Sequence, residues 1–182
     1  HGIEGETQDA AILEDRSYTV KALLASLFLA NGTPMLLAGD EFGNSQQGNN
    51  NSYCQDNPIT WLDWQQADEA LQGYTRDLIR LRQEIKLLGD DVWWKQERVR
   101  WLNIQGETMS ELCWHNRGAK AMQIVLDDEW LLLINAKRSQ QIFNLPQGSW
   151  QISCVPSEKF NYNADGKLTV EHMGIWVLQR KN

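Results

Sequence analysis

The sequence predicts an α+β protein in which a helical first half is followed by an antiparallel β-sandwich. Three observations lead to this prediction. Residues 9–31 form a long apolar stretch without Pro, and residues 71–88 repeat apolar side chains at helical spacing. Beyond residue 91 the chain breaks into short apolar runs separated by turn residues, as in β-sandwiches and barrels. With 182 residues and 42% hydrophobic content, the chain can form a core.

The first helix is expected over residues 9–31. Asp9 can cap its N-terminus, and Gly32 and Pro34 are typical of a helix end. The stretch 23–29 is apolar nearly all round, which predicts burial on most sides. Residues 34–38 continue as an apolar run, which suits a strand buried on both faces of a parallel sheet. Helix, turn and strand together predict an α/β unit.

A polar loop follows from residue 40 to residue 68, rich in Asn, Gln, Gly, Ser and Asp. A loop of this length is usually functional or disordered. It begins with two adjacent carboxylates, Asp40 and Glu41, at the carboxyl end of the predicted strand, where α/β folds collect ligands. Neighbouring residues of a strand point to opposite faces. We therefore favour a structural role for the two carboxylates over an acid–base pair.

A second helix is predicted from one apolar stripe, and we expect it to pack on a sheet. The stripe consists of Leu71, Tyr74, Leu78, Leu81, Ile85 and Leu88. After it, strands are expected in the short runs at 92–94, 99–103, 111–115, 121–127, 129–136, 141–145, 149–155, 167–173 and 174–180. Asp127-Asp128 and Asp165-Gly166 suit hairpin turns. These patterns divide the chain into residues 1–90 and 91–182.

Composition limits the class of function. A net charge of −7 and a pI near 5.0 argue against nucleic-acid binding, and no apolar run is long enough for a transmembrane helix. Three cysteines without a C-x-x-C pair make a disulfide framework or zinc site improbable and fit a cytoplasmic protein. No cofactor or metal is expected. The opening at His1 lacks signal-peptide features, which indicates a fragment or processed product.

Two further features have a structural and a functional interpretation. Cys113 and His115 are two apart on a predicted strand and would share a face, as a nucleophile pair could, but a core thiol and an edge imidazole are favoured. Nine tryptophans can fill a core or stack on sugar rings, and core filling is favoured.

Two motifs resemble the bacterial glycogen debranching enzymes of the α-amylase superfamily, close to the isoamylases. They are TPMLLAGDE at residues 33–41 and NSYCQDN at residues 51–57, and LIRLR at 78–82 agrees with them. The resemblance implies that residues 1–90 are the end of a (β/α)8 TIM barrel, with its eighth strand, the following loop and its last helix. Residues 91–182 would be the C-terminal antiparallel β-sandwich.

The resemblance also implies a function. The family hydrolyses α-1,6-glucosidic branch linkages in glycogen and limit dextrin with three carboxylates on barrel strands four, five and seven, which would precede His1. No catalytic residue is therefore assigned to this chain, which is expected to be inactive alone and to need the missing N-terminal barrel as a partner. An α-glucan would contact the rim of the cleft through Asp40, Glu41, Asn51, Tyr53, Gln55, Asp56 and Trp61.

Other interpretations stay open at this point. The chain could be a carbohydrate-binding β-sandwich with a helical preface, which exposed and coplanar tryptophans on one face would favour. It could also be a purely structural sandwich that stabilises a barrel. Within the superfamily, a trehalose-releasing trehalohydrolase is the nearest alternative.

Overall fold

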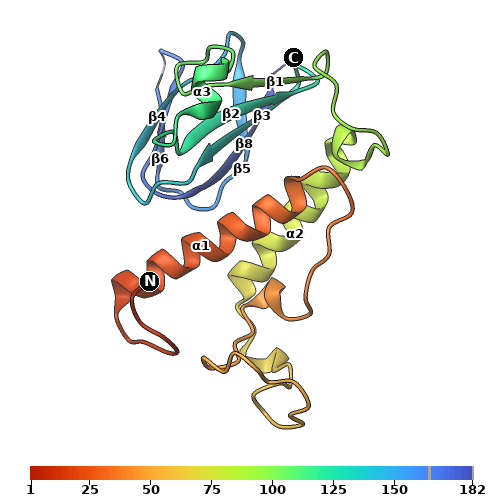
Figure 1. The fold of residues 1–182 in the computed structure, drawn as a ribbon, viewed down its shortest axis with the longest axis vertical. Coiled ribbons are helices and arrows are strands. Elements are labelled where there is room, and N and C mark those ends of the chain that lie inside the picture. Colours follow the sequence, from red (N-terminus) through yellow and green to blue (C-terminus); the bar gives the residue numbers. More distant parts are fainter. Residues whose placement is uncertain (164, 182) are drawn as a thin grey trace.

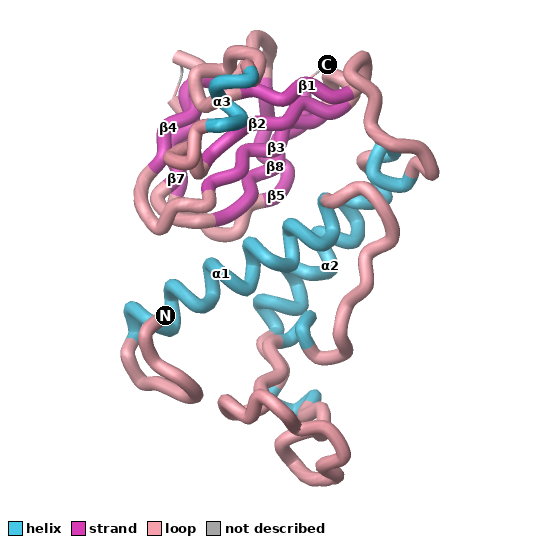
Figure 2. Tube along the Cα trace, in the orientation of Figure 1, coloured by secondary structure: helices cyan, strands magenta, loops and turns pink. Residues whose placement is uncertain are grey.

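The computed structural model describes residues 1–163 and 165–181, which form three layers (Figures 1 and 2). Helices α1 (Ala10–Leu29) and α2 (Glu69–Glu84) form the first layer. The middle layer is a five-stranded sheet in the order β1 (Val99–Leu102), β2 (Ala121–Leu126), β3 (Trp130–Asn135), β8 (Gly174–Arg180), β5 (Trp150–Cys154). A three-stranded sheet with the order β4 (Gln141–Asn144), β7 (Lys167–Val170), β6 (Phe160–Tyr162) forms the third. All strand pairs are antiparallel.

Two hydrophobic cores lie on the two faces of the five-stranded sheet, because successive strand residues point to opposite sides. In β3, Trp130 and Leu132 pack in the core shared with the helices. Leu131 and Leu133 lie in the core shared with the three-stranded sheet. The α+β class and the antiparallel sandwich predicted from the sequence are thus confirmed.

Helix α1 begins as predicted. The carboxylate of Asp9 accepts hydrogen bonds from the backbone N–H groups of Ala11 at 2.9 Å and Ile12 at 3.3 Å, which satisfies donors that have no partner within the helix. The expectation of burial on most sides is wrong, since only one stripe of the helix packs against other elements. Phe28 lies in the core, whereas Leu23 is 66% exposed.

The buried strand expected at residues 34–38 is absent from the described structure. These residues have no strand assignment, and Met35 is 88% exposed. A strand requires hydrogen bonds to a neighbouring strand, and within the described residues both sheets lie elsewhere. Residues 34–38 therefore lack the neighbouring strands and the packing on both faces that a buried strand requires.

Helix α2 confirms the predicted stripe, because all six of its apolar side chains are buried. The α-helix itself ends at Glu84, and the short 3-10 helix Lys86–Gly89 places Leu88 in the same core. Asp68 caps α2 by accepting from the backbone N–H of Leu71 at 2.9 Å.

Seven of the predicted runs contain strands, and the differences have local causes. Residues 111–115 form the short helix α3 (Glu111–His115), in which the hydroxyl of Ser110 accepts from the backbone N–H of Cys113. Cys113 and His115 were expected to share a face of a strand. This expectation is wrong, because both lie in helix α3. Residues 92–94 are not a strand, and β6 was missed.

Both predicted hairpin turns are confirmed. Asp127 and Asp128 join β2 to β3 with φ angles of 50° and 56°, the left-handed conformation that both central residues of a type I′ turn adopt. Gly166, with a φ of 77°, lies in the connection between the paired strands β6 and β7. Neither long helix of the described chain combines the length and hydrophobicity needed to cross a membrane.

Candidate functional site

The polar loop lies between α1 and α2 in the chain and projects beyond the N-terminal end of α2, which lies away from the sheets (Figure 1). Its base is fixed by the aromatic pair Phe42 and Trp64, whose ring centroids are 4.4 Å apart. The carbonyl of Phe42 accepts from the backbone N–H of Asp68 at 3.0 Å. Since Asp68 also caps α2, the base of the loop is continuous with the first turn of that helix.

Asp40 and Glu41 lie in a 3-10 helix, Asp40–Phe42, at the start of this loop. The carboxylate of Glu41 accepts from the backbone N–H of Gly39 at 2.8 Å, so it braces the turn. Gly39 has a φ of 102°, and a Cβ atom there would lie 2.6 Å from the Cβ of Asn44. Only glycine fits this turn. Asp40 is exposed.

Gln55 holds the tip of the loop together. Its side-chain N–H donates to the carbonyl of Asn51 at 3.1 Å, and its side-chain oxygen accepts from Asn49 at 3.2 Å. Its backbone carbonyl accepts from the hydroxyl of Thr60 at 2.5 Å. The side-chain bonds use one donor and one acceptor site of the Gln55 amide and fix its position within the loop.

Two aromatic rings at the tip face solvent. Tyr53 is 85% exposed and Trp61 is 56% exposed. The indole N–H of Trp61 donates to the carboxylate of Asp56 at 2.8 Å, which orients the ring. The side chain of Asn51 is also exposed. The structure thus places all seven predicted rim residues in one loop. The rings of Tyr53 and Trp61 are open to a ligand, whereas other side chains form hydrogen bonds within the loop.

His172 lies in a buried cluster that no sequence motif indicated. Its Nε2 lies 2.5 Å from the hydroxyl of Ser157, its Nδ1 lies 2.7 Å from the carbonyl of Met173, and its ring stacks on Tyr18 at 3.6 Å. Burial lowers the pKa of His172. The second ring nitrogen faces a carbonyl instead of a carboxylate, so the triad arrangement that activates a serine is not formed.

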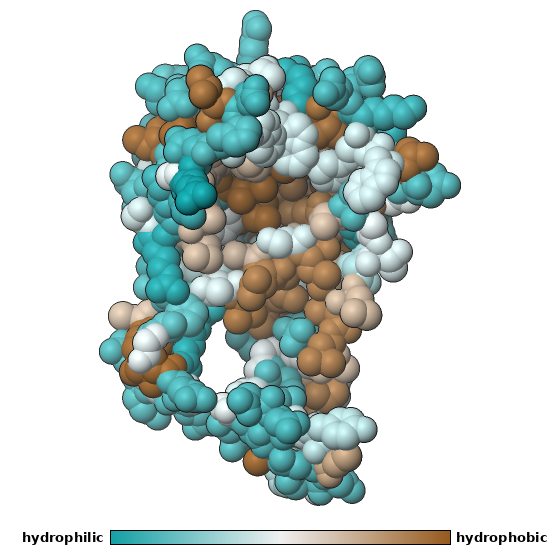
Figure 3. All heavy atoms as spheres, in the orientation of Figure 1, coloured by the Kyte–Doolittle hydropathy of each residue, from teal (hydrophilic) through white to brown (hydrophobic). Residues whose placement is uncertain are grey.

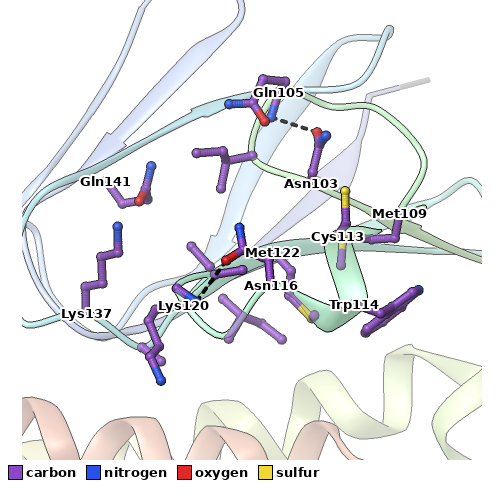
Figure 4. Close-up of a pocket in the computed structure, with 16 residues that line it drawn as sticks. Asn103, Gln105, Met109, Cys113, Trp114, Asn116, Lys120, Met122, Lys137 and Gln141 are labelled. Carbon is purple, nitrogen blue, oxygen red and sulfur yellow. Dashed lines mark hydrogen bonds between the residues drawn. The ribbon is translucent and has the colours of Figure 1, made fainter. Parts of the chain in front are cut away.

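A cavity of about 550 Å³ on the sandwich was also not predicted (Figure 4). Its lining includes the polar side chains Asn103, Gln105, Asn116, Lys137 and Gln141, which are spread over about forty residues of sequence. These residues meet only because the strands pair, so no short sequence motif indicates the cavity. Among the residues that the structure describes, no three His, Cys, Asp or Glu side chains gather as a metal site requires.

Comparison with known proteins agrees with this architecture. A family model described as "Glycogen debranching enzyme C-terminal domain" matches residues 95–170. The chain is 54% identical over 157 residues to the glycogen operon protein GlgX homolog of Haemophilus influenzae, covering 83% of the chain and 24% of that protein. It is 50% identical over 170 residues to the glycogen debranching enzyme of Dickeya chrysanthemi, covering 92% of the chain and 26% of that protein.

Solved structures show the same fold. The pullulanase of Paenibacillus barengoltzii, a mutant complexed with maltotriose, matches with a TM-score of 0.71 and 24% identity over 93% of the chain and 26% of its own length. A pullulanase of Anoxybacillus sp. complexed with maltotriose matches with a TM-score of 0.68 and 16% identity over 97% of the chain and 24% of its own length. At these identities the likeness concerns the fold.

The chain therefore belongs to a class of proteins in which a helical segment is joined to an antiparallel C-terminal β-sandwich. More specifically, the chain corresponds to the C-terminal portion of the glycogen debranching enzymes, which confirms the resemblance found in its motifs. It spans about a quarter of the length of the curated relatives that it matches.

Proposed function

We propose that the chain is the C-terminal part of a debranching enzyme that hydrolyses α-1,6-glucosidic branch linkages in glycogen and limit dextrin in the cytoplasm. The observation that carries this proposal is the identity of 50 to 54% with relatives named for glycogen debranching or the glycogen operon, across more than four fifths of the chain. The catalytic acid and nucleophile come from a preceding part of the protein, so this chain alone is inactive.

Residues 1–90 are proposed to complete a (β/α)8 barrel, and residues 91–182 to form the sandwich domain that follows it. Support comes from an apolar face on the helical layer (Figure 3). The exposed large apolar side chains of residues 1–90 include Leu13, Val20, Leu23, Met35, Leu37 and Ile79. Exposed apolar surface of this extent is typical of an interface. Barrel strands preceding residue 1 would cover it and would give residues 34–38 the strand partners that they lack here.

The polar loop is proposed to form part of the rim of the glucan cleft. Tyr53 and Trp61 offer ring faces for stacking on glucose units. Asp40 and Asn51 present polar groups to sugar hydroxyls. The remaining predicted rim residues Glu41, Gln55 and Asp56 position the loop through the hydrogen bonds described above.

The test compares this chain alone with a longer protein in which the barrel precedes it. Reducing-sugar release from limit dextrin is expected only from the longer protein. There, Tyr53→Ala and Trp61→Ala are expected to raise KM more than they lower kcat, because rim contacts bind substrate and transition state alike. Turnover by the chain alone that disappears on Asp40→Ala or Glu41→Ala would overturn the proposal.

A further inference from the structure

Four of the nine tryptophans lie together on the sandwich. The ring centroids of Trp94 and Trp101 are 6.0 Å apart, and those of Trp101 and Trp114 are 5.6 Å apart. Trp93 precedes Trp94 in the chain and lines the same cavity. These four residues, which we call the tryptophan row, come from the segment before β1, from β1 itself and from helix α3.

Two members of the row face solvent, whereas Trp94 and Trp101 are partly buried and pack against the core shared with the helices. Trp93 is 86% exposed and Trp114 is 51% exposed, whereas the core tryptophans Trp130, Trp150 and Trp176 are at most 3% exposed. Large exposed rings that gather in one place mark a binding surface more often than isolated ones do. The indole N–H of Trp94 is buried and has no acceptor within the described part of the chain.

The row contributes to the walls of two cavities. One, of about 600 Å³, lies between the C-terminal end of α1 and the five-stranded sheet, and Trp93, Trp94 and Trp101 line it. In Figure 3 an apolar hollow is visible between the sandwich and the helices. The other is the polar cavity of Figure 4, which Trp114 lines. Ile134 lines both cavities, so they are neighbours on the same sheet.

The polar cavity offers hydrogen-bonding groups beside the rings. In Figure 4, Lys137 extends toward Gln141, while Asn103 and Gln105 form another wall and Trp114 lies on the side away from Lys137. Amides both donate and accept hydrogen bonds, which suits hydroxyl groups. Pockets of about 300 to 1,000 Å³ with apolar walls and a few polar groups are typical of small-ligand sites. The combination of ring faces and amides is that of a sugar-binding surface.

We infer that the tryptophan row binds an α-1,4-linked glucan chain at a site separate from the polar loop. Neighbouring rings are tilted by 44° and 66°, so they cannot lie flat against a ribbon-like β-1,4-linked glucan. Tilted rings instead follow the curvature of an α-1,4-linked chain, whose successive glucose units turn. The choice of ligand rests on the proposed function, whereas the place of binding is inferred from the tryptophan row and the two cavities.

The row and the polar loop lie at opposite ends of α2 (Figure 1). A helix of 16 residues is roughly 24 Å long at 1.5 Å per residue. One short oligosaccharide therefore occupies one site or the other, whereas a long outer chain of glycogen can engage both. Attachment at two points raises the effective concentration of substrate at the loop.

The experiment titrates the 182-residue chain with maltohexaose and cellohexaose by calorimetry, using variants that separate the two sites. Tyr53→Ala with Trp61→Ala removes the exposed rings of the loop. Trp93→Ala with Trp114→Ala removes the exposed rings of the row. All four side chains are exposed, and circular dichroism melts check that each variant keeps its fold. Trp93→Ala alone serves if the Trp114 change unfolds the chain. Sedimentation of the unmodified chain and of the row variant measures self-association.

Maltohexaose is expected to bind the loop variant, and replacing the row as well is expected to weaken binding by on the order of tenfold or more, the equivalent of about 1.4 kcal/mol. Cellohexaose is expected to bind at least tenfold more weakly. No binding to the loop variant, or equal binding of both sugars, would overturn the inference. So would self-association that the row variant abolishes, because the row would then be a contact between copies. Failure of the loop proposal gives a different result, in which the row variant alone loses all binding.

Discussion

Arg82 joins three segments of the helical layer, and its replacement tests how that layer is held together. Its guanidinium donates to the carbonyls of Phe28, Ala30 and Leu88 at 2.7 Å each, and to the carbonyl of Gly32. The last carbonyls of a helix have no partner within it, so Arg82 from α2 satisfies the end of α1. Burial lowers the pKa of Arg82, yet a guanidinium stays charged at neutral pH.

The expected loss of stability follows from the burial of these bonds. The bonds to Phe28 and Leu88 are partly buried, whereas those to Ala30 and Gly32 are exposed, where water can replace the guanidinium. A hydrogen bond to a charged group contributes about 1.5 kcal/mol at the lower end of its range. Two such bonds give about 3 kcal/mol for Arg82→Ala. Arg82→Lys keeps the charge but loses the planar fork, so it is expected to cost about 1 to 2 kcal/mol.

Urea unfolding followed by tryptophan fluorescence measures these free energies by linear extrapolation. Arg80→Ala is the matched control, because Arg80 lies on the same helix with a 67% exposed side chain and pairs only with Asp77 and Glu84 at the surface. Its expected cost is below about 0.5 kcal/mol. If Arg82→Ala destabilised the chain no more than Arg80→Ala does, the guanidinium would not be what joins these segments.

The sequence predicted well those elements in which the spacing of apolar residues alone shows which side chains are buried. The stripe of α2 needs only an apolar surface to pack on, so spacing alone identified its six buried apolar side chains. Residues 34–38 differ, because an apolar run becomes a strand only where another strand pairs with it. Residues 111–115 also differ, since a run of five apolar and polar residues is equally compatible with one helical turn. There the cap from Ser110 favours the helix.

The same reasoning separates the two candidate sites. The polar loop is a contiguous segment, so its composition was sufficient to find it. The tryptophan row depends on tertiary structure, because Trp101 pairs with Ile124 across β1 and β2 while Trp114 arrives on a helix that the sequence did not predict. A tryptophan can contact a ligand only where its ring is exposed, and the composition of the sequence does not show which tryptophans are buried.

Two further predictions concern the buried residues Leu78 and His172. Leu78→Ala is expected to cost about 3 to 5 kcal/mol, because Leu78 is fully buried and its removal leaves a cavity; Ile79→Ala, at a 42% exposed position of the same helix, should cost less than about 1 kcal/mol in the same urea assay. The second concerns pH. Burial depresses the pKa of His172 in the folded state, the hydrogen bond with the Met173 carbonyl opposes this shift, and the charges of Lys159 and Glu14 act in opposite directions. Above the unfolded pKa of about 6.5 the imidazole is neutral in both states, and the folded state keeps its full stability. As the pH falls through that value, the unfolded state takes up a proton first, so stability decreases until the folded state is protonated as well. His172→Gln should flatten the free energy of unfolding measured between pH 7.5 and pH 5.5, at about the unfolded pKa and one unit to either side, and an unchanged slope would show that other groups govern it.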